Sequence, residues 1–164
     1  MEIPGLDIRY TYVTDSGKLR EWVTHPSVLP WFPVSTEQEI ADALQCWVGF
    51  SRWCSSLTVT IDHTPVAIGT LFLMPYKKVA HQALCKIVVD PKWQRRGIGL
   101  SLMRNLKHLA KNYFHLDQIG CEIFEGNPIR GLLEKSEFKE IFIQSGYVKE
   151  GKTYKARIYM EVEL

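Results

Sequence analysis

A buried strand, a glycine-bearing loop and an amphipathic helix follow one another directly between residues 83 and 113. The apolar stretch 83–89 ends in three β-branched residues, which predicts a strand buried on both faces. The loop 90–97 follows, and from Ile98 to Tyr113 apolar residues recur every three or four positions, which predicts a helix with one buried side. This unit requires a sheet that is covered by helices.

The rest of the chain surrounds this unit with further strands. Apolar alternation or apolar runs predict strands at 8–12, 57–61, 66–74, 118–124, 140–148 and 153–162. Helices are expected at 19–23, 36–50 and 127–133, with a capping box that pairs either Ser35 with Gln38 or Thr36 with Glu39. Pro128 suits the first turn of the last helix. The expected fold class is α/β (an α+β mixed sheet) in a single domain over residues 1–164.

Composition excludes several other classes of protein. Apolar residues make up 46% of the 164 residues and charged residues 23%, as is ordinary for a folded globular chain. No apolar run approaches the roughly 20 residues of a membrane span, and the first residues do not resemble a signal peptide. We therefore expect a cytoplasmic protein with reduced thiols, in which Cys85 and Cys121 are buried as small apolar groups. The spacing of cysteines and histidines indicates no metal site.

Charge is distributed unevenly along the chain. Residues 91–116 contain six lysines and arginines and no acid, so they carry +6, whereas the whole chain carries +2 and the remainder −4. This asymmetry favours an anionic partner at the segment, although a solvated basic helix face would look the same. The small net charge argues against a nucleic acid as that partner.

The loop before the helix has the features of a phosphate site. Gly97 and Gly99 leave room for a ligand to approach the backbone, and the helix that starts there presents unpaired N–H donors and a positive dipole end. Arg95 and Arg96 add charge, so pyrophosphate is the expected ligand. A P-loop is excluded because no Gly-Lys-Ser/Thr follows, and the dinucleotide fingerprint is excluded because position 102 is leucine.

The longer pattern V-x-P-x-x-Q-x-x-G-x-G resembles the acyl-CoA loop of the GNAT superfamily of N-acetyltransferases. The resemblance implies a splayed central sheet flanked by helices, with acetyl-CoA as cosubstrate. It also implies that the backbones of Ile87 and Val89 bind the pantetheine arm, and that Asn127 contacts that arm or caps the following helix. The cofactor-binding residues implied in this way are Ile87, Val89, Gln94, Arg95, Arg96, Gly97, Ile98, Gly99, Leu100, Ser101 and Asn127.

Glu122 is the catalytic residue that the resemblance implies. The stretch from Glu122 to Asn127 is similar to one in the branch that acetylates ribosomal-protein N-termini, where the glutamate is the general base. An ammonium group must lose a proton before it attacks a thioester, and a carboxylate acting through water can accept that proton. The alternative is a glutamate at the sheet edge in a salt bridge.

The family's usual tyrosine general acid is missing from this sequence. The preferred alignment of its segment places Leu133 at that position, and a second alignment places Phe142 there. The acid is then Tyr147, Ser136 or water, or else the thiolate leaves without assistance, as a thiol pKa near 8.5 allows.

The leading hypothesis is an acetyl-CoA-dependent N-acetyltransferase that acts by direct attack of a primary amine. Aromatic residues in the first third of the chain, among them Trp31 and Phe32, would suit a small-molecule amine with an apolar part. A protein N-terminal or lysine acetyltransferase is one alternative, and a non-catalytic acyl-CoA-binding module is another. No membrane or nucleic acid partner is expected, and an oligomer is possible.

Overall fold

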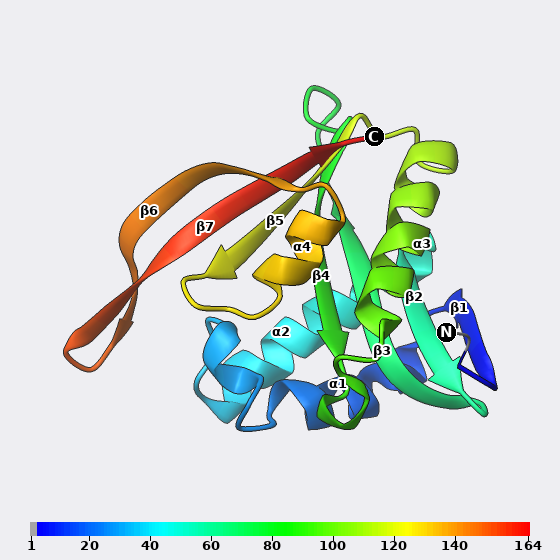
Figure 1. Cartoon of the computed structure of the whole chain (residues 1–164), viewed down its shortest axis with the longest axis horizontal. Coiled ribbons are helices and arrows are strands. Elements are labelled where there is room, and N and C mark those ends of the chain that lie inside the picture. Colours follow the sequence, from blue (N-terminus) through cyan, green and yellow to red (C-terminus); the bar gives the residue numbers. More distant parts are fainter. Residues whose placement is uncertain (1–2) are drawn as a thin grey trace.

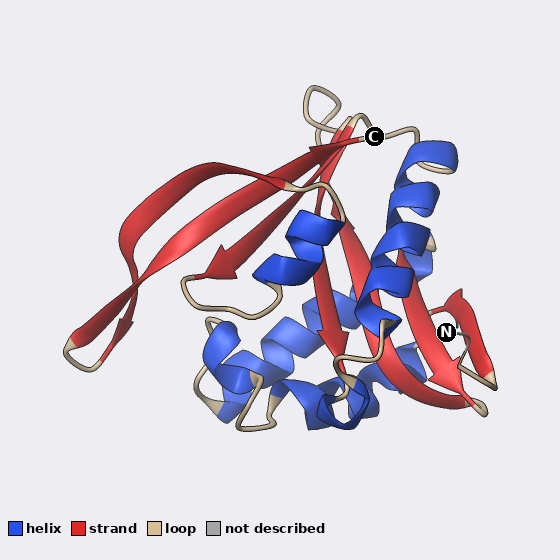
Figure 2. Ribbon diagram, in the orientation of Figure 1, coloured by secondary structure: helices blue, strands red, loops and turns tan. Residues whose placement is uncertain are grey.

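The computed structural model describes residues 3–164, which form one mixed sheet with helices on both faces (Figures 1 and 2). The strand order is β1-β2-β3-β4-β5-β7-β6. The strands are β1 (Leu6–Tyr10), β2 (Ser56–Ile61), β3 (Thr64–Leu73), β4 (Gln82–Val89), β5 (Gln118–Phe124), β6 (Lys139–Glu150) and β7 (Thr153–Glu163). The α-helices are α1 (Ser16–Val23), α2 (Glu37–Gly49), α3 (Ile98–Asn112) and α4 (Arg130–Lys135). This confirms the expected fold class.

The sheet separates two hydrophobic cores. On one face α3 and α4 pack against alternate residues of the strands, such as Cys85 and Ile87 of β4. On the other face α1 and α2 pack against Ile68 of β3 and Val88 of β4. Neighbouring side chains of β4 therefore enter different cores, as the apolar run predicted.

Strands β4 and β5 separate along their length. They are the parallel pair of the sheet, and their register covers three residue pairs, ending at Leu84 and Gly120. Beyond that point β4 continues to Val89 and β5 to Phe124 with no pairing between them. The backbone groups that β4 turns toward β5 are thus available to a ligand over the last five residues of β4.

The chain ends in a long hairpin of β6 and β7 that projects beyond the helices (Figure 1). β6 forms the outer edge of the sheet, and its side chains are exposed over almost its whole length. The pairing of β6 with β7 shifts between Gln144 and Val148, so this hairpin contains a bulge.

The predicted elements occur within three residues of their expected bounds, and the largest shifts are at the starts of α1 and α4. α4 begins at Arg130, not at Asn127, because residues 125–129 form turns held by hydrogen bonds from the Asn127 N–H to the Phe124 carbonyl and from the Arg130 N–H to the Asn127 carbonyl. Of the two predicted capping boxes, Thr36 with Glu39 is the one that starts α2. No helix of residues 3–164 is long and apolar enough to span a membrane.

Candidate active site

The loop between β4 and α3 holds its shape through its own hydrogen bonds. Asp90 accepts the Lys92 N–H at 2.9 Å, and the side-chain amide of Gln94 donates to the Val89 carbonyl at 3.1 Å. Arg95 and Gly97 both have positive φ, of 62° and 84°. The first backbone bond of α3 runs from the Ser101 N–H to the Gly97 carbonyl, so the N–H groups of residues 98–100 remain available at the positive end of the helix.

Glycine is required at positions 97 and 99 for different physical reasons. A Cβ on Gly97 would meet no described atom within 4 Å, but its φ of 84° strains any other residue. A Cβ on Gly99 would lie 2.4 Å from a methyl carbon of Leu132. Gly97 therefore leaves the loop open to a ligand, whereas Gly99 lets α4 pack closely against α3.

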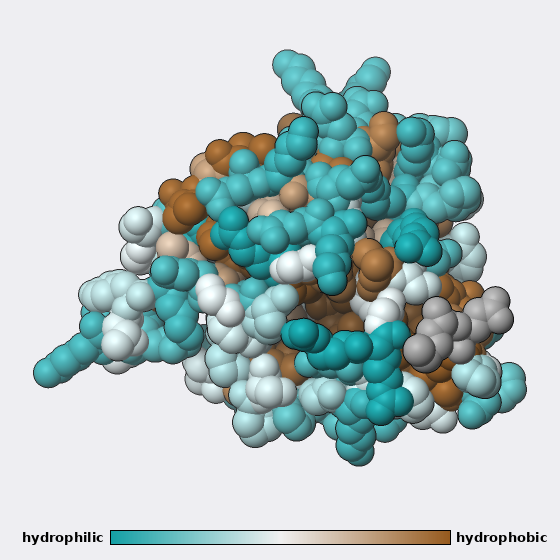
Figure 3. All heavy atoms as spheres, viewed as in Figure 1, coloured by the Kyte–Doolittle hydropathy of each residue, from teal (hydrophilic) through white to brown (hydrophobic). Residues whose placement is uncertain are grey.

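A cavity of about 440 Å³ extends from this loop along the unpaired part of β4. The space-filling view of this face has a hollow with an apolar floor and a hydrophilic border between α4 and the loop (Figure 3). The cavity is lined by the loop, by the end of β4, by α4 and by the aromatic pair Trp31 and Phe32 of the segment between α1 and α2. The helix N-terminus, where the phosphates are predicted to bind, and the end of β4, where the pantetheine arm is predicted to bind, both line this cavity.

Eight of the eleven predicted cofactor residues line this cavity: Ile87, Val89, Gln94, Arg95, Gly97, Gly99, Leu100 and Asn127. The other three are placed differently. Ile98 is buried in the core, the guanidinium of Arg96 lies over the Trp93 ring at 4.7 Å, and the Ser101 N–H is already bonded within α3. Gln94 also has a structural role, since its amide ties the loop to β4.

Asn127 is not the N-cap of α4, which is Ile129, so that expected role is wrong, and its contact with the pantetheine arm stays a prediction. Its side-chain oxygen accepts the Ile129 N–H at 3.0 Å and so shapes the turn before α4. The residue also lines the cavity, next to Pro128 and Ile129. Lys135 of α4 lines the cavity as well. No local pattern predicted this residue, because it lies 40 residues beyond Arg95.

Glu122 lies on β5, two residues past its last pairing with β4. Because Cys121 and Ile123 belong to the core under α3, the side chain between them faces the α1 and α2 side. Its carboxylate binds the Arg157 guanidinium of β7 at 2.7 Å, and its side chain is 38% exposed. The structure thus contains the salt bridge that was expected as the alternative to a general base. Glu122 is not among the described residues that line the cavity along β4, so its role as a base stays a prediction.

The candidates for a general acid are placed as follows. Leu133, at the position of the family's tyrosine, is fully buried in the core. The side-chain hydroxyl of Ser136 is buried with no hydrogen-bond partner among the described residues, and Tyr147 is exposed under the Arg157 guanidinium. Tyr159, which sequence reasoning missed, faces the same side as Glu122, and its hydroxyl donates to Glu161 at 3.1 Å. Burial and this hydrogen bond raise the pKa of Tyr159 to about 12.

Two cysteines meet at the point where the strands separate. Cys85 and Cys121 are both buried, as predicted. The hydrogen bond with the Cys121 thiol and burial raise the pKa of the Cys85 thiol well above its ordinary value. Cys85 therefore stays protonated and is a poor nucleophile, which agrees with transfer that involves no covalent enzyme intermediate.

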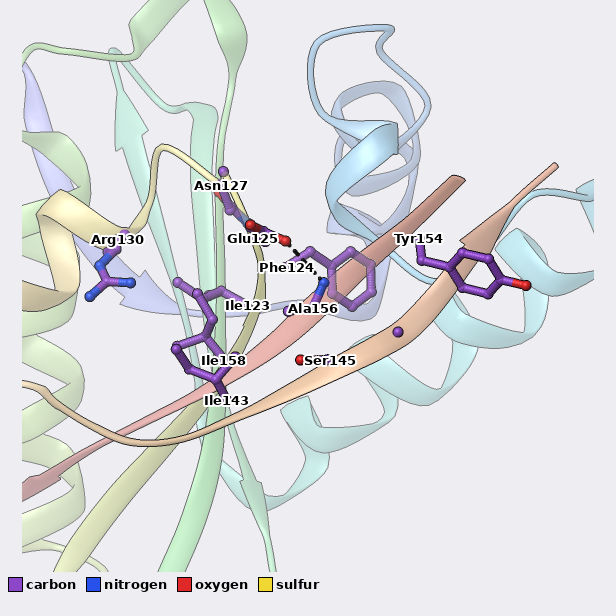
Figure 4. Close-up of a pocket in the computed structure, with 12 residues that line it drawn as sticks. Ile123, Phe124, Glu125, Asn127, Arg130, Ile143, Ser145, Tyr154, Ala156 and Ile158 are labelled. Atoms are coloured by element: carbon purple, nitrogen blue, oxygen red, sulfur yellow. Dashed lines mark hydrogen bonds between the residues drawn. The ribbon is translucent and has the colours of Figure 1, made fainter. Parts of the chain in front are cut away.

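A second hollow, of about 560 Å³, lies between α4 and the β6–β7 hairpin (Figure 4). Ile123, Ile143 and Ile158 gather between Arg130 and Phe124 in this hollow, and the Glu125 carboxylate accepts the Ala156 N–H at 3.3 Å. Asn127 lines both hollows, so they meet at the loop after β5.

Comparison with known proteins identifies the family. The model of the acetyltransferase (GNAT) family matches residues 18–138, which span the first two helices, the glycine loop and α4. The chain belongs to the GNAT family. Acetyl-CoA is the cosubstrate that the GNAT family uses, and membership of that family is what the match shows for this chain.

The sequence comparison also finds a distant relative within the family. An L-amino acid N-acetyltransferase, AaaT of Escherichia coli K12, is 27% identical over 105 residues, which are 64% of this chain and 57% of the relative. The match thus spans little more than half of that relative's length.

Solved structures resemble the whole chain. The yncA structure from Salmonella typhimurium, solved with its cofactor acetyl-CoA, has a TM-score of 0.81 and 13% identity and covers 98% of this chain and 94% of its own. A ribosomal-protein-alanine N-acetyltransferase from Brucella melitensis has a TM-score of 0.80 and 16% identity, over 96% and 99%. At these identities the likeness concerns the GNAT fold alone.

Proposed function

We propose that this GNAT protein transfers the acetyl group of acetyl-CoA to the primary amine of a small molecule that has an apolar part. The observation that carries the proposal is the cavity along β4, which ends at Trp31 and Phe32. These rings give an apolar wall to the side from which an acceptor would reach the thioester. The relative that acts on L-amino acids supports an acceptor of this size. The expected cytoplasmic location belongs to the same proposal.

The charges on the acceptor side argue against a polyamine. Lys86 of β4 faces this side, with its ammonium 5.8 Å from the Trp47 ring centre and 5.2 Å from that of Phe72. It has no salt bridge with any acid in the described part of the chain. Lys155 lies over the Trp31 ring at 5.4 Å. A second ammonium group on an acceptor would therefore meet like charges.

The test is an acceptor screen that measures CoA thiol release from acetyl-CoA. Amino acids, aryl amines, polyamines and short peptides would be compared at one pH, with Gly97→Trp as a variant that obstructs the cavity at the loop, where a Cβ meets no described atom within 4 Å. We expect turnover with small amines or amino acids and none with the variant. Turnover confined to peptides would favour protein acetylation instead, and release of no thiol with any acceptor would favour a non-catalytic acyl-CoA-binding module.

A further inference from the structure

The Glu122–Arg157 ion pair lies on the face where the acceptor is proposed to bind. Arg157 follows Ala156 and precedes Ile158, which are both buried, and it is in register with Phe124 of β5 and Gln144 of β6. Its Nη1 donates to the Glu122 carboxylate at 2.7 Å and its Nη2 to the Gln144 side-chain oxygen at 2.8 Å. The pair thus places an acidic and a basic group in direct contact across β5 and β7, next to the stretch of β5 that is not paired with β4.

The guanidinium is held in place by its surroundings. It lies 4.4 Å from the ring centre of Tyr147 and 5.6 Å from that of Phe142, and Phe142 in turn stacks on Tyr159. The Arg157 side chain is only 21% exposed. Its Nε is buried and has no hydrogen-bond partner among the described residues. A fixed and partly desolvated guanidinium binds a carboxylate more strongly than a mobile surface arginine does.

Arg157 also has donors to spare. A guanidinium carries five N–H groups, and two of them bind Glu122 and Gln144. The second N–H groups of Nη1 and Nη2 can donate to another carboxylate without loss of either bond, whereas the Nε–H is buried. Gln144 and the rings of Tyr147 and Phe142 carry no negative charge, so they would compete only weakly with that carboxylate for the guanidinium.

We infer that Arg157 selects acceptors that carry a carboxylate next to the amine, that is, free α-amino acids. This inference rests on the proposed function. The acceptor carboxylate binds Arg157, and its ammonium group lies against Glu122, on the side of the gap where the thioester is expected. Because Glu122 and Arg157 touch, the two charges of the acceptor must be close together. A single carbon separates them in an α-amino acid, whereas a peptide carries its carboxylate far from its N-terminus.

The experiment compares acids with their amides. Phenylalanine, leucine and methionine and the three corresponding amides are used as acceptors with the wild type, Arg157→Gln and Arg157→Lys. We expect the wild type to have a KM for the acids at least about tenfold below that for the amides, as charge-assisted hydrogen bonds imply. In Arg157→Gln the KM for the acids rises by about tenfold or more and that for the amides changes by less than about threefold. Arg157→Lys, which keeps the positive charge, should retain part of the preference for the acids over the amides that Arg157→Gln loses.

Lys149→Gln is the matched control. Lys149 lies on the same hairpin and its ammonium is 5.9 Å from the Tyr154 ring centre, a similar cation–ring contact. It is expected to leave every KM unchanged, and CoA affinity is measured in all variants to show that they fold.

Three outcomes would overturn the inference. The first is a wild type that uses the amides as well as the acids, and the second is an Arg157→Gln protein that loses both equally, as a purely structural role predicts. The third applies when no acceptor is acetylated, so that the proposed function fails. Calorimetric titration of phenylalanine into the CoA complex then tests the role of Arg157 separately from turnover. Binding that is lost in Arg157→Gln supports the inference, and absence of binding to the wild type overturns it.

Discussion

At the scale of single residues, Gly97 and Gly99 can be separated by experiment. Gly97→Ala adds a methyl group in open space but forces a φ of 84° on alanine, so the loop must shift. We expect weaker CoA binding with little loss of stability. Gly99→Ala instead places a methyl group 2.4 Å from a methyl carbon of Leu132, so the Leu132 side chain must change rotamer or α3 and α4 must move apart. We expect a lower free energy of unfolding, by about 1–3 kcal/mol, measured by urea denaturation. Equal effects of both changes on binding and stability would contradict this assignment.

Glu122 is expected to act as the general base. Glu122→Gln removes the negative charge but leaves an oxygen that can accept the Arg157 hydrogen bond, so the fold should persist. Turnover at neutral pH should fall by roughly 10²–10⁴-fold with unchanged CoA affinity. The loss should shrink at higher pH, where more of the amine is already neutral. A variant with full activity at pH 7 would leave Glu125 or a water network as the base.

Tyr159 tests whether the leaving thiolate needs an acid. Its pKa of about 12 lies more than three units above the roughly 8.5 of a thiol, so the phenol is a poor proton donor to the thiolate. We therefore expect Tyr159→Phe to retain kcat within about fivefold, and Tyr147→Phe to serve as a comparison on the same side of the sheet. A loss of a hundredfold or more in Tyr159→Phe alone would identify it as the general acid.

At the scale of elements, a buried chain of hydroxyl groups joins the α1 and α2 side to the first three strands. The Trp47 indole donates to Thr70, whose hydroxyl contacts Ser56 at 2.6 Å. Thr11 and Thr58 continue the chain toward Asp15, just before α1. Asp15 in turn binds Arg9 of β1 through both carboxylate oxygens.

The Asp15 carboxylate should make stability depend on pH. Burial alone would raise the pKa of Asp15, but hydrogen bonds from Arg9, the Tyr12 N–H and Thr58 outweigh burial and lower it. Its stabilisation is therefore present above the unfolded-state pKa of about 3.9 and is lost as pH falls through the lower folded-state pKa. Asp15→Asn should cost about 1–3 kcal/mol of unfolding free energy at pH 7, and the difference from wild type should narrow toward pH 3. Urea denaturation of both proteins at pH 7 and pH 3 measures this difference in unfolding free energy. A difference that is the same at both pH values would show that the Asp15 charge does not stabilise the fold.

Local patterns predicted the fold well and the acceptor side poorly. The strand, the glycine loop and the helix of residues 83–113 depend on neighbours in sequence, so periodicity and glycine spacing were sufficient to place them. Arg157 contacts Glu122 across 35 positions, through a hairpin whose bulge between Gln144 and Val148 sets which side chains meet. A one-residue change in that register would turn Arg157 to the other face, and the sequence does not contain a signal that fixes it. The same holds for the hydroxyl chain, whose members come from β2, from β3 and from Thr11 just after β1.

At the scale of the whole molecule, the charge distribution should guide acetyl-CoA to its site. The +6 of residues 91–116 is concentrated around the loop and α3, while the remainder of the chain carries −4. The field at the cavity is thus positive although the net charge is only +2. Because acetyl-CoA is an anion, its binding should weaken when salt shortens the Debye length from about 10 Å at 0.1 M to about 3 Å at 1 M.

We expect the KM for acetyl-CoA to rise at least about fivefold over that range of salt, whereas kcat, measured at saturation, stays nearly constant. Arg95→Gln removes a charge that lines the cavity and should make the rise shallower. Lys111→Gln removes the same charge near the far end of α3, about 20 Å along the helix from its start, which is beyond the Debye length. It should therefore keep the wild-type dependence on salt. If the two variants respond alike, the whole molecule's net charge governs the encounter; if only Arg95→Gln differs, the local field at the loop does.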